Sequence, residues 1–289
     1  MNRLFNFLFA CLTALLLHPV ALHGQAFSGL AGDRLDVDIN GNIYVLNRER
    51  NSLSLWTKDG VRVREMGGSG WENNQFDRPS GIWARNGIDV FVADYGNHRI
   101  QRFDRNLNYI STLFTRDDPD PDKRFGYPED VSLSRLGYLF ICDGENGRIA
   151  KVNQFAQIER TFGGFGAGEG RLLSPTHVAC GPKDHVFVID GERLVVFDNF
   201  GNYLHAVEGV FHGRLALFAG ESRVTVVDSS TIFCLDGDER VVYSASTTSV
   251  CGVSGRDIDA IAVARDSMFV LTGQGMIVVP DPAIHARDR

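Results

Sequence analysis

Short apolar segments recur along the chain, separated by turns rich in glycine and polar residues. Six of these segments end in Asp, Asn or Thr, at 43–47, 90–94, 139–143, 186–190, 224–228 and 268–272. Their starts lie 47, 49, 47, 38 and 44 residues apart. Segments this short and this rich in Val, Ile and Phe are typical of strands rather than helices. Six copies at this spacing indicate a propeller or a related repeat array.

Each repeat contains four candidate strands. In three repeats the leading apolar residue of the first strand lies 12 residues before the terminal Asp: Ile82 to Asp94, Val131 to Asp143, and Val178 to Asp190. A fixed interval predicts a fixed hairpin and therefore four-stranded antiparallel blades. The sixth repeat lacks a fourth strand, and the segment at 25–32 (QAFSGLAG) has no other partner. We predict an all-β, six-bladed β-propeller in which this N-terminal segment closes the last blade.

The first 24 residues differ from the rest. They carry one full charge, Arg3, followed by an apolar run over 7–17 that is short for a membrane span. This pattern is typical of a signal peptide. We expect a leader at 1–24, cleaved after Gly24 or Ala26, a propeller at 25–282 and a polar tail at 283–289. The protein would then be exported to the periplasm or the extracellular space without a membrane span, and an uncleaved anchor is the alternative.

Charge narrows the range of partners. The chain has 29 basic and 36 acidic residues, and only Arg3 among them lies in the leader, which leaves a net charge near −8. That charge argues against nucleic acid, whose phosphates need a basic face. It also disfavours anionic membrane surfaces.

Four cysteines follow the leader, and none forms a Cys-x-x-Cys metal or redox motif. An oxidising compartment would allow bridges, and the pairings that we consider are Cys142–Cys180 and Cys234–Cys251. Four buried thiols, packed as small apolar side chains, are the alternative. The sequence leaves both open.

Three stretches resemble NHL repeats: FDRPSGIWARNGIDVFVADYGNHRIQRFD (76–104), TFGGFGAGEGRLLSPTHVACGPKDHVFVID (161–190) and MGGSGWENNQFDRP (66–79). The resemblance includes the Asn-His-Arg of the family's name and covers the second to fourth repeats best. It implies a propeller, in agreement with the repeat count. It does not imply an activity, because one fold supports many functions.

The motif around Asp94 recurs in sibling repeats, which favours a structural role. Asp94 would accept from turn amides, and Arg99 would bridge blades. The third repeat keeps the Asp and the Arg but has Gly147 where His98 stands. We therefore expect His98 to face solvent.

Two loops resemble ligand motifs without meeting their requirements. GGFGAGEG (163–170) has no following Lys-Ser or Lys-Thr, so we interpret its glycines as turn residues. In DDPDPDKRFGYPED (117–130) the acids fall at calcium-loop positions, but Lys123 occupies the place of the required glycine. We interpret this stretch as a solvated acidic loop that covers part of one face.

The residues just before each inner strand vary between repeats and are polar, and in propellers such residues point into the channel. The candidate ligand-binding residues at this channel mouth are Asp33, Arg34, Glu129, Asp130, His177, Arg214 and Asp259. Acids and bases converging at one mouth suit a polar ligand or a cation. We predict an exported, non-catalytic binding or scaffold module for a protein or a small polar ligand, with no cofactor, although calcium stays possible.

An enzyme remains the alternative. Peptidyl-amidoglycolate lyases resemble this chain in the amino-acid sequence of their blades. They hold zinc with Pro-His pairs at the start of each blade, however, and this chain has Pro-Ser, Pro-Glu and Pro-Thr at those places. A catalytic zinc needs three protein ligands, and His177, one residue out of register, stands without a complete set. Calcium-dependent lactonase propellers are a second resemblance, which Glu129, Asp130, Asp33 and Asp259 could loosely imitate. The alternative function is thus a metal-assisted hydrolase or lyase acting in the channel.

Overall fold

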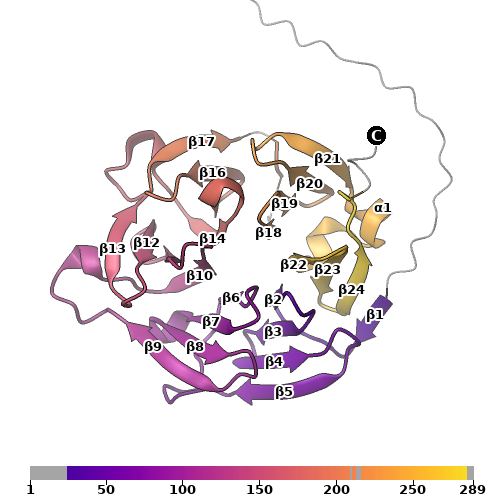
Figure 1. Cartoon of the computed structure of the whole chain (residues 1–289), viewed down its shortest axis with the longest axis horizontal. Coiled ribbons are helices and arrows are strands. Elements are labelled where there is room, and N and C mark those ends of the chain that lie inside the picture. The colour runs from indigo at the N-terminus through magenta and orange to yellow at the C-terminus, as the bar shows by residue number, and fades with distance from the viewer. Residues whose placement is uncertain (1–24, 209, 213–215, 285–289) are drawn as a thin grey trace, which may run out of the picture.

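The computed structural model describes residues 25–208, 210–212 and 216–284. Six four-stranded sheets stand around a central axis like the blades of a propeller (Figure 1). Every strand pair within the sheets is antiparallel. The predicted fold class is confirmed.

Within each blade the strands run outward from the channel in sequence order. Blades one to three are β2 (Arg34–Val37), β3 (Ile43–Asn47), β4 (Ser52–Trp56), β5 (Arg62–Gly67); β6 (Gly81–Trp83), β7 (Asp89–Asp94), β8 (Arg99–Asp104), β9 (Tyr109–Phe114); and β10 (Pro128–Leu133), β11 (Leu139–Asp143), β12 (Arg148–Val152), β13 (Ile158–Phe162). Blades four to six are β14 (Pro175–Cys180), β15 (Val186–Asp190), β16 (Arg193–Phe197), β17 (Tyr203–Val207); β18 (Ala216–Ala219), β19 (Val224–Val227), β20 (Thr231–Leu235), β21 (Val241–Ser246); and β22 (Ile258–Ala264), β23 (Ser267–Thr272), β24 (Gly275–Pro280).

The ring closes between its two ends. Strand β1 (Gln25–Ser28) pairs antiparallel with β24, with Gln25 opposite Val278, and forms the outer strand of blade six (Figure 1). The predicted closure by the N-terminal segment is confirmed, although the strand covers only the first half of the segment at 25–32. Beyond β24, Ala283 is buried in the hydrophobic core.

Helical structure is limited to short turns between strands. The α-helix α1 (Thr247–Cys251) follows β21, and the 3₁₀ turns are η1 (Tyr95–Asn97), η2 (Pro121–Lys123), η3 (Gly168–Gly170), η4 (Pro182–Asp184) and η5 (Gly255–Asp257). In the described part of the chain, no helix has the length and apolar character to cross a membrane.

Burial falls from the second and third strands of each blade to the fourth. Every residue of β11 and β15 is buried, whereas the outer strands β5 and β21 are mostly exposed. The inner sheet positions pack on both faces, which explains their continuous runs of Val, Ile and Phe. Apolar contacts between neighbouring blades therefore form the core.

Neighbouring inner strands are also joined by hydrogen bonds from side chain to backbone. Asp36 accepts from the Ala84 amide at 2.9 Å, and Ser80 donates to the Pro128 carbonyl at 2.6 Å. The same type of bond joins Ser132 to Cys180 at 3.1 Å. Each of these partners is 48 residues away in the sequence, which is one blade, so these side chains set the spacing around the channel.

Candidate functional site

The Asp at the end of each second strand stabilises the local turn. Asp94 is fully buried, accepts from the Asp77 amide at 2.8 Å and from Asn97 at 3.0 Å, and pairs with Arg99 at 2.7 Å. Arg99 also donates to three carbonyls of the loop that precedes blade two, at 2.6, 3.1 and 3.0 Å. Burial raises the pKa of Asp94, and the bonds to Asn97, Asp77 and Arg99 oppose that shift. The predicted structural role is confirmed.

Arg148 and Arg193 repeat this arrangement in blades three and four. Arg148 binds Asp143 at 3.1 Å, and Arg193 binds Asp190 at 2.6 Å. Both also donate to backbone carbonyls of the loop before their own blade, including that of Arg171. In each of blades two to four, one Asp–Arg pair therefore holds both a hairpin and the connection to the preceding blade.

His98 differs from the prediction. The residue is half-buried in a left-handed conformation (φ 52°), and its Nδ1 accepts from the Tyr127 amide at 3.0 Å. Arg116 Nη1 lies 2.7 Å from the same nitrogen, and the ring packs edge-on against Tyr127. Burial, and then Arg116, lower the pKa of His98. The expectation that His98 faces solvent was wrong, because the ring bridges blade two to the loop before blade three.

The predicted mouth residues lie where the inner strands begin. Arg34, Asp130 and His177 come together and line a narrow section of the channel with a cavity of about 40 Å³, which is space for one or two waters. Asp33 accepts from the Arg48 amide at 2.7 Å. Glu129 and Asp259 precede the lining residues Asp130 and Ala260 in the sequence but do not line the narrow section themselves, and Arg214 lies outside the described residues.

Three β-bulges determine which of these side chains face the channel. The register shifts between Pro128 and Asp130 in β10, and at the corresponding places in β14 and β22. An extra residue on one strand reverses the alternation of side chains beyond it. The residues just after the shifts, Asp130, His177 and Ala260, all line the narrow section.

Asp130 is a buried carboxyl of the narrow section, bonded to two backbone amides. Its Oδ1 accepts from the Val131 amide at 2.9 Å, and its Oδ2 accepts from the Val178 amide of blade four at 3.1 Å. Burial raises the pKa of Asp130 to about 7, against the opposing charges of Arg34 and Arg85. Burial also raises the pKa of Glu129, against Arg48 and Arg34. A carboxyl that titrates near neutrality in a channel wall is a candidate acid–base group.

A larger cavity opens at the other end of the channel, where the inner strands end. This cavity, the wide mouth, has a volume of about 660 Å³. Each inner strand contributes at least one apolar side chain to its wall from its last two residues, including Val37, Trp83, Leu133, Cys180, Phe218 and Val263. Its volume is typical of small-ligand sites.

Arg85 separates the wide mouth from the narrow section and lines both. From blade two, its Nε lies 3.3 Å from the buried Asp36 of blade one. Its Nη1 donates to the Ala219 carbonyl of blade five, on the far side of the channel. The guanidinium carbon also lies 4.2 Å from the centre of the Phe218 ring. A single side chain thus forms the floor of the wide mouth.

The rim of the wide mouth carries exposed aliphatic side chains at turn tips. Ile39, Ile88 and Leu136, from three consecutive blades, are 64%, 66% and 56% exposed. The turns of blades one and two touch, because a Cβ at Gly87 would lie 3.1 Å from Ile39 Cγ1. The rim also carries charged side chains, and Arg135 of blade three binds Asp184 of blade four at 3.2 Å.

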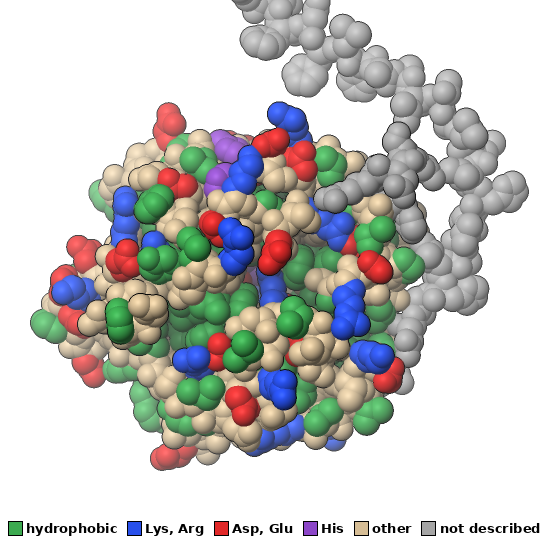
Figure 2. Space-filling model, viewed as in Figure 1, with side chains coloured by type: hydrophobic (Ala, Val, Ile, Leu, Met, Phe, Trp, Pro, Cys, Tyr) green, Lys and Arg blue, Asp and Glu red, His purple; other side chains and the backbone are tan. Residues whose placement is uncertain are grey.

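The wide mouth was not predicted from the sequence. The predicted site comprised residues at the start of the inner strands, whereas the wide mouth is formed by the residues that end them. A signal was available, since a large apolar residue that ends an inner strand, such as Trp83 or Leu133, recurs in several blades. The face shown in Figure 2 carries acidic and basic side chains interspersed around a central hollow, without a patch of one sign.

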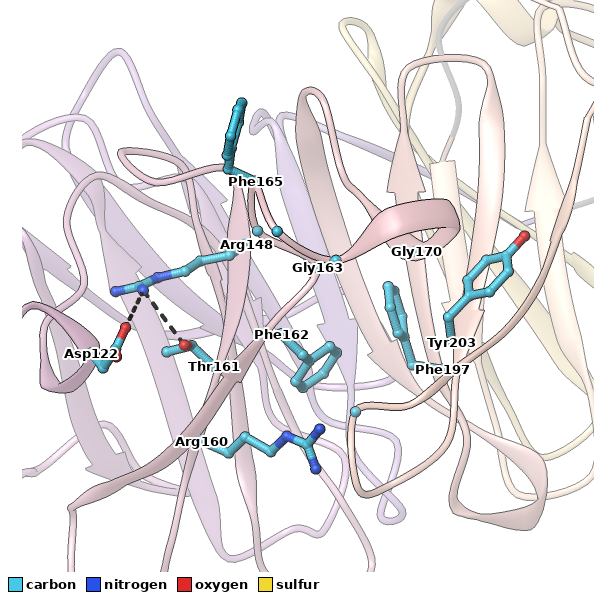
Figure 3. A pocket seen from close by; sticks show the side chains of 14 residues that line it. Asp122, Arg148, Arg160, Thr161, Phe162, Gly163, Phe165, Gly170, Phe197 and Tyr203 are labelled. Atoms are coloured by element: carbon cyan, nitrogen blue, oxygen red, sulfur yellow. Dashed lines mark hydrogen bonds and ion pairs between the residues drawn. The ribbon is translucent and has the colours of Figure 1, made fainter.

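A third cavity lies at the outer edge of the ring, between blades three and four, with a volume of about 520 Å³. Its wall includes the glycine-rich loop at 163–170 and the aromatic rings of Phe162, Phe197 and Tyr203 (Figure 3). Arg148 crosses its far edge, bound to Asp122 at 3.2 Å and to Thr161 at 3.4 Å (Figure 3). The predicted turn glycines therefore also line a cavity.

Metal ligands do not cluster in the described part of the chain, where no three His, Cys, Asp or Glu side chains are grouped to hold an ion. In the acidic loop, Asp118 and Asp120 accept from backbone amides two residues ahead, and Asp122 pairs with Arg148. The four described cysteines are free thiols. Cys142 donates to the Pro175 carbonyl, and burial raises the pKa of Cys180 to about 12.

No protein-family model matches the chain. NHL repeat-containing protein 3 of Homo sapiens is 27% identical over 217 residues, which are 67% of this chain and 58% of that protein. Protein brain tumor of Drosophila melanogaster is 30% identical over 145 residues, 49% of this chain and 13% of that protein. The chain is a six-bladed β-propeller homologous to NHL-repeat proteins.

The chain spans less than two thirds of the length of either relative. A probable peptidyl-alpha-hydroxyglycine alpha-amidating lyase of Caenorhabditis elegans is 28% identical over 152 residues, 49% of this chain and 41% of that protein. Among solved structures, a streptogramin B lyase superposes with a TM-score of 0.60 at 14% identity, over 86% of this chain and 78% of that one. Virginiamycin B lyase from Staphylococcus aureus gives 0.58 at 15% identity, over 85% and 78%. At such identities the likeness shows the fold alone.

Proposed function

We propose that the protein is a binding or scaffold module that engages its ligand at the wide mouth. The observation that supports this most is the cavity of about 660 Å³ to which every blade contributes an apolar side chain. The floor of this cavity is Arg85, which offers a guanidinium beside the Phe218 ring. An apolar wall with few polar groups at its base is the usual composition of a ligand site.

The rim favours a protein as the ligand. Ile39, Ile88 and Leu136 stand exposed on consecutive blades beside the cavity. A small ligand would use only the cavity, whereas a protein surface would also cover the three turn tips and remove their apolar area from water. The polar residues at the opposite end of the channel, including Arg34, Asp130 and His177, remain a second proposed contact region.

A photo-crosslinking amino acid placed at Ile39, Ile88 or Leu136 tests this proposal in cells. We expect one discrete protein adduct, shared by the three positions. The matched control is Val63, an aliphatic residue that is 59% exposed on the outer strand β5, away from the channel. Absence of adducts at the rim, or the same adducts at Val63, would contradict binding at the wide mouth.

Export is part of the proposal and rests on the leader-like residues 1–24. Strand β1 begins at Gln25 and supplies the outer strand of blade six. Cleavage after Gly24 would keep this strand whole, whereas cleavage after Ala26 would remove half of it. N-terminal sequencing of the protein from an exported fraction should therefore find Gln25 first, and recovery of an intact chain from the cytoplasm would oppose export.

A metal-assisted hydrolase or lyase acting in the channel is the second candidate. It is supported by Asp130, whose pKa near 7 suits proton transfer at neutral pH. Elemental mass spectrometry before and after mild chelation tests it. Stoichiometric calcium or zinc that is lost in Glu129→Ala, Asp130→Ala or His177→Ala would favour the enzyme and justify a substrate screen, and a metal-free, folded protein would favour the binding module.

A further inference from the structure

The interfaces between blades one and two and between blades three and four are built from the same parts. The loop from Met66 to Pro79 and the loop from Phe162 to Pro175 are equally long and carry glycine pairs at the same places. The turns at 104–109 and 198–203 share the same Asx bonds, from Asn108 to Asp104 and from Asn202 to Asp198. Position-by-position differences between the two interfaces can therefore be interpreted directly.

The interface between blades one and two, the closed interface, has its outer edge filled. Arg64 Nη1 donates to the Asn106 carbonyl at 2.9 Å and to Asn108 Oδ1 at 2.8 Å. Leu107 adopts a left-handed conformation (φ 64°) and is fully buried in the core that Met66 also contacts. At this edge, therefore, the Arg64 guanidinium is hydrogen-bonded within the protein and the Leu107 side chain is packed in its core.

The interface between blades three and four, the open interface, has different residues at these places. Arg160 corresponds to Arg64, Gly201 to Leu107 and Phe162 to Met66. A Cβ at Gly201 would lie 2.4 Å from the Phe162 ring, so the ring occupies the space that leucine takes in the closed interface. Within the part of the chain that the structure describes, the Arg160 guanidinium forms no hydrogen bond or ion pair.

The two connecting loops differ as well. In the loop of the closed interface, Trp71 packs edge-on against Phe114 at 5.6 Å and lies 4.9 Å from the Arg99 guanidinium. In the open interface the residue that corresponds to Trp71 is Ala167. The aromatic residue of this loop is instead Phe165, which is 85% exposed. The Arg171 guanidinium carbon lies 4.5 Å from the centre of the Phe165 ring. A largely exposed aromatic ring thus stands at the edge of the cavity (Figure 3).

We propose that the cavity of the open interface binds a carboxylate carried on an aromatic or apolar body, with Arg160 holding the carboxylate. Figure 3 shows the Arg160 guanidinium beneath Phe162, at the cavity edge. The acids around it are already engaged: Asp122 binds Arg148, and Asp198 accepts three bonds from its own turn and interacts with Arg160 only electrostatically, without an ion pair. Arg160 is therefore the lining cation that keeps its donors for a ligand.

The remaining walls suit the rest of such a ligand. Tyr203 and Phe165 offer accessible ring surfaces, Phe162 and Phe197 are buried rings of the wall, and the glycines at 163, 164 and 166 allow close approach to the backbone. A volume of about 520 Å³ lies within the range of small-molecule sites. Arginine binds carboxylates through two parallel hydrogen bonds, which gives orientation as well as affinity. This site is independent of the wide mouth and of the function proposed there.

Phenylacetate is the first probe, and phenylacetamide, its uncharged match, is the second. Titration into ¹⁵N-labelled protein, followed by amide chemical shifts, reports both affinity and place. We expect phenylacetate to shift the amides of 163–167 and to bind about tenfold more tightly than phenylacetamide, because a charge-assisted bond is lost. Equal binding of the two probes, no binding of either, or shifts confined to the channel would overturn the proposal.

Arg160→Ala should weaken phenylacetate binding about tenfold. The control is Arg64→Ala, the same change at the closed interface, which should leave the affinity unchanged. Arg160 is exposed, so its loss should not unfold the protein. If Arg64→Ala weakened binding as much as Arg160→Ala did, the site would not lie at the open interface.

A peptide ending in a free Phe carboxylate distinguishes the two sources of the ligand. Tighter binding of acetyl-glycyl-glycyl-phenylalanine than of phenylacetate would identify a protein C-terminus, and the reverse order would identify a small free acid. In either case the affinity should fall with Arg160→Ala. Binding of the peptide that was indifferent to Arg160→Ala would overturn the assignment of the carboxylate.

Discussion

The closed and open interfaces show how one repeat can serve either stability or binding. Both use a loop of equal length, an Asx turn and an arginine on the outer strand. In the closed interface, Arg64 and Leu107 form contacts within the protein. In the open interface, Gly201 and Phe162 fill the same space differently, and Arg160 and Phe165 are left exposed. A few substitutions outside the hairpin motif thus separate a structural contact from a candidate site.

The inner edges of the same interfaces differ in a related way. Asp36, between blades one and two, accepts from the Ala84 amide and pairs with Arg85. Asp130, between blades three and four, accepts from the Val178 amide and has no ion pair within 4 Å in the described residues. Burial raises the pKa of both carboxyls. At the channel, too, the two interfaces differ: the buried carboxyl of the closed interface has an ion-pair partner, whereas that of the open interface has none in the described residues.

The largest expected effect concerns the arginines that anchor the two connecting loops. Arg99 is 3% exposed against a fully buried Asp94, whereas Arg193 is 21% exposed. Arg99→Ala leaves a buried acid without its cation, and should lower the free energy of unfolding by about 3–5 kcal/mol. Arg193→Ala should cost about 1–2 kcal/mol, because solvent reaches the pair. Urea unfolding measures both, and equal losses would show that the two loops are anchored equally.

Leu107→Ala should have the next largest effect. The side chain is fully buried in the closed interface, so its removal should cost about 2–4 kcal/mol through lost burial and a residual cavity. The control is Phe200→Ala in the corresponding turn of the open interface, where the ring is 65% exposed and the change should stay within about 0.5 kcal/mol. Thermal unfolding monitored by circular dichroism compares them, and similar shifts would refute the distinction.

Gly201→Leu introduces into the open interface the residue that occupies the corresponding position of the closed interface. Alone, it should destabilise by about 2–3 kcal/mol, because the Cβ collides with Phe162 and leucine is strained at φ 80°. Adding Phe162→Met recreates the pair found in the closed interface, and should restore all but about 1 kcal/mol of backbone strain.

The same double variant should bind phenylacetate less well than the unaltered protein, since leucine fills part of the cavity. A double variant that is no more stable than Gly201→Leu would show that the two interfaces are not interchangeable in packing. The double-mutant cycle by urea unfolding gives this coupling directly.

The last prediction is a pH dependence that arises at the inner edge of the open interface. The pKa of Asp130 is raised from 3.8 to about 7, so the folded protein keeps a proton between these values that the unfolded chain has released. The resulting stability is fully present below pH 3.8 and is lost as the pH rises through about 7. Asp130→Asn should flatten this part of the stability profile.

The control for this measurement is Asp59→Asn, a change at an exposed turn, which should leave the profile unchanged. Unfolding temperatures at pH steps from 4 to 8 provide the comparison. A profile with the same slope in Asp130→Asn as in the unaltered protein would show that another group titrates.

Sequence analysis succeeded where the structure depends on near neighbours. The apolar segments, their turns and the 12-residue interval predicted six blades, and the missing fourth strand predicted the closure by β1. The Asp–Arg pairs of blades two and three were identified because they recur at the same spacing, whereas the pair of blade four, Asp190 and Arg193, has a shorter spacing and was not predicted. Strand alternation and turn chemistry depend on residues within a few positions of one another, so these features are visible in a single chain.

The β-bulges were not predictable in the same way. Glu129 and Asp259 were assigned to the channel mouth from their place before an inner strand, yet a register shift at each decides which neighbour faces the channel. A bulge is a property of two paired strands, so one strand's sequence does not reveal it. His98 was misplaced for a similar reason, since its partner Tyr127 lies in the loop of the next blade.

The sequence by itself determined the repeat, the number of blades, the way the ring closes and the residues that hold each hairpin. Only the tertiary structure decided where space remains. The wide mouth depends on side chains from six blades meeting at one depth, and the cavity of the open interface depends on Phe162 and Gly201 meeting across two blades. Cavities are what remains after distant side chains have packed to high density, and no local pattern carries that balance of volumes.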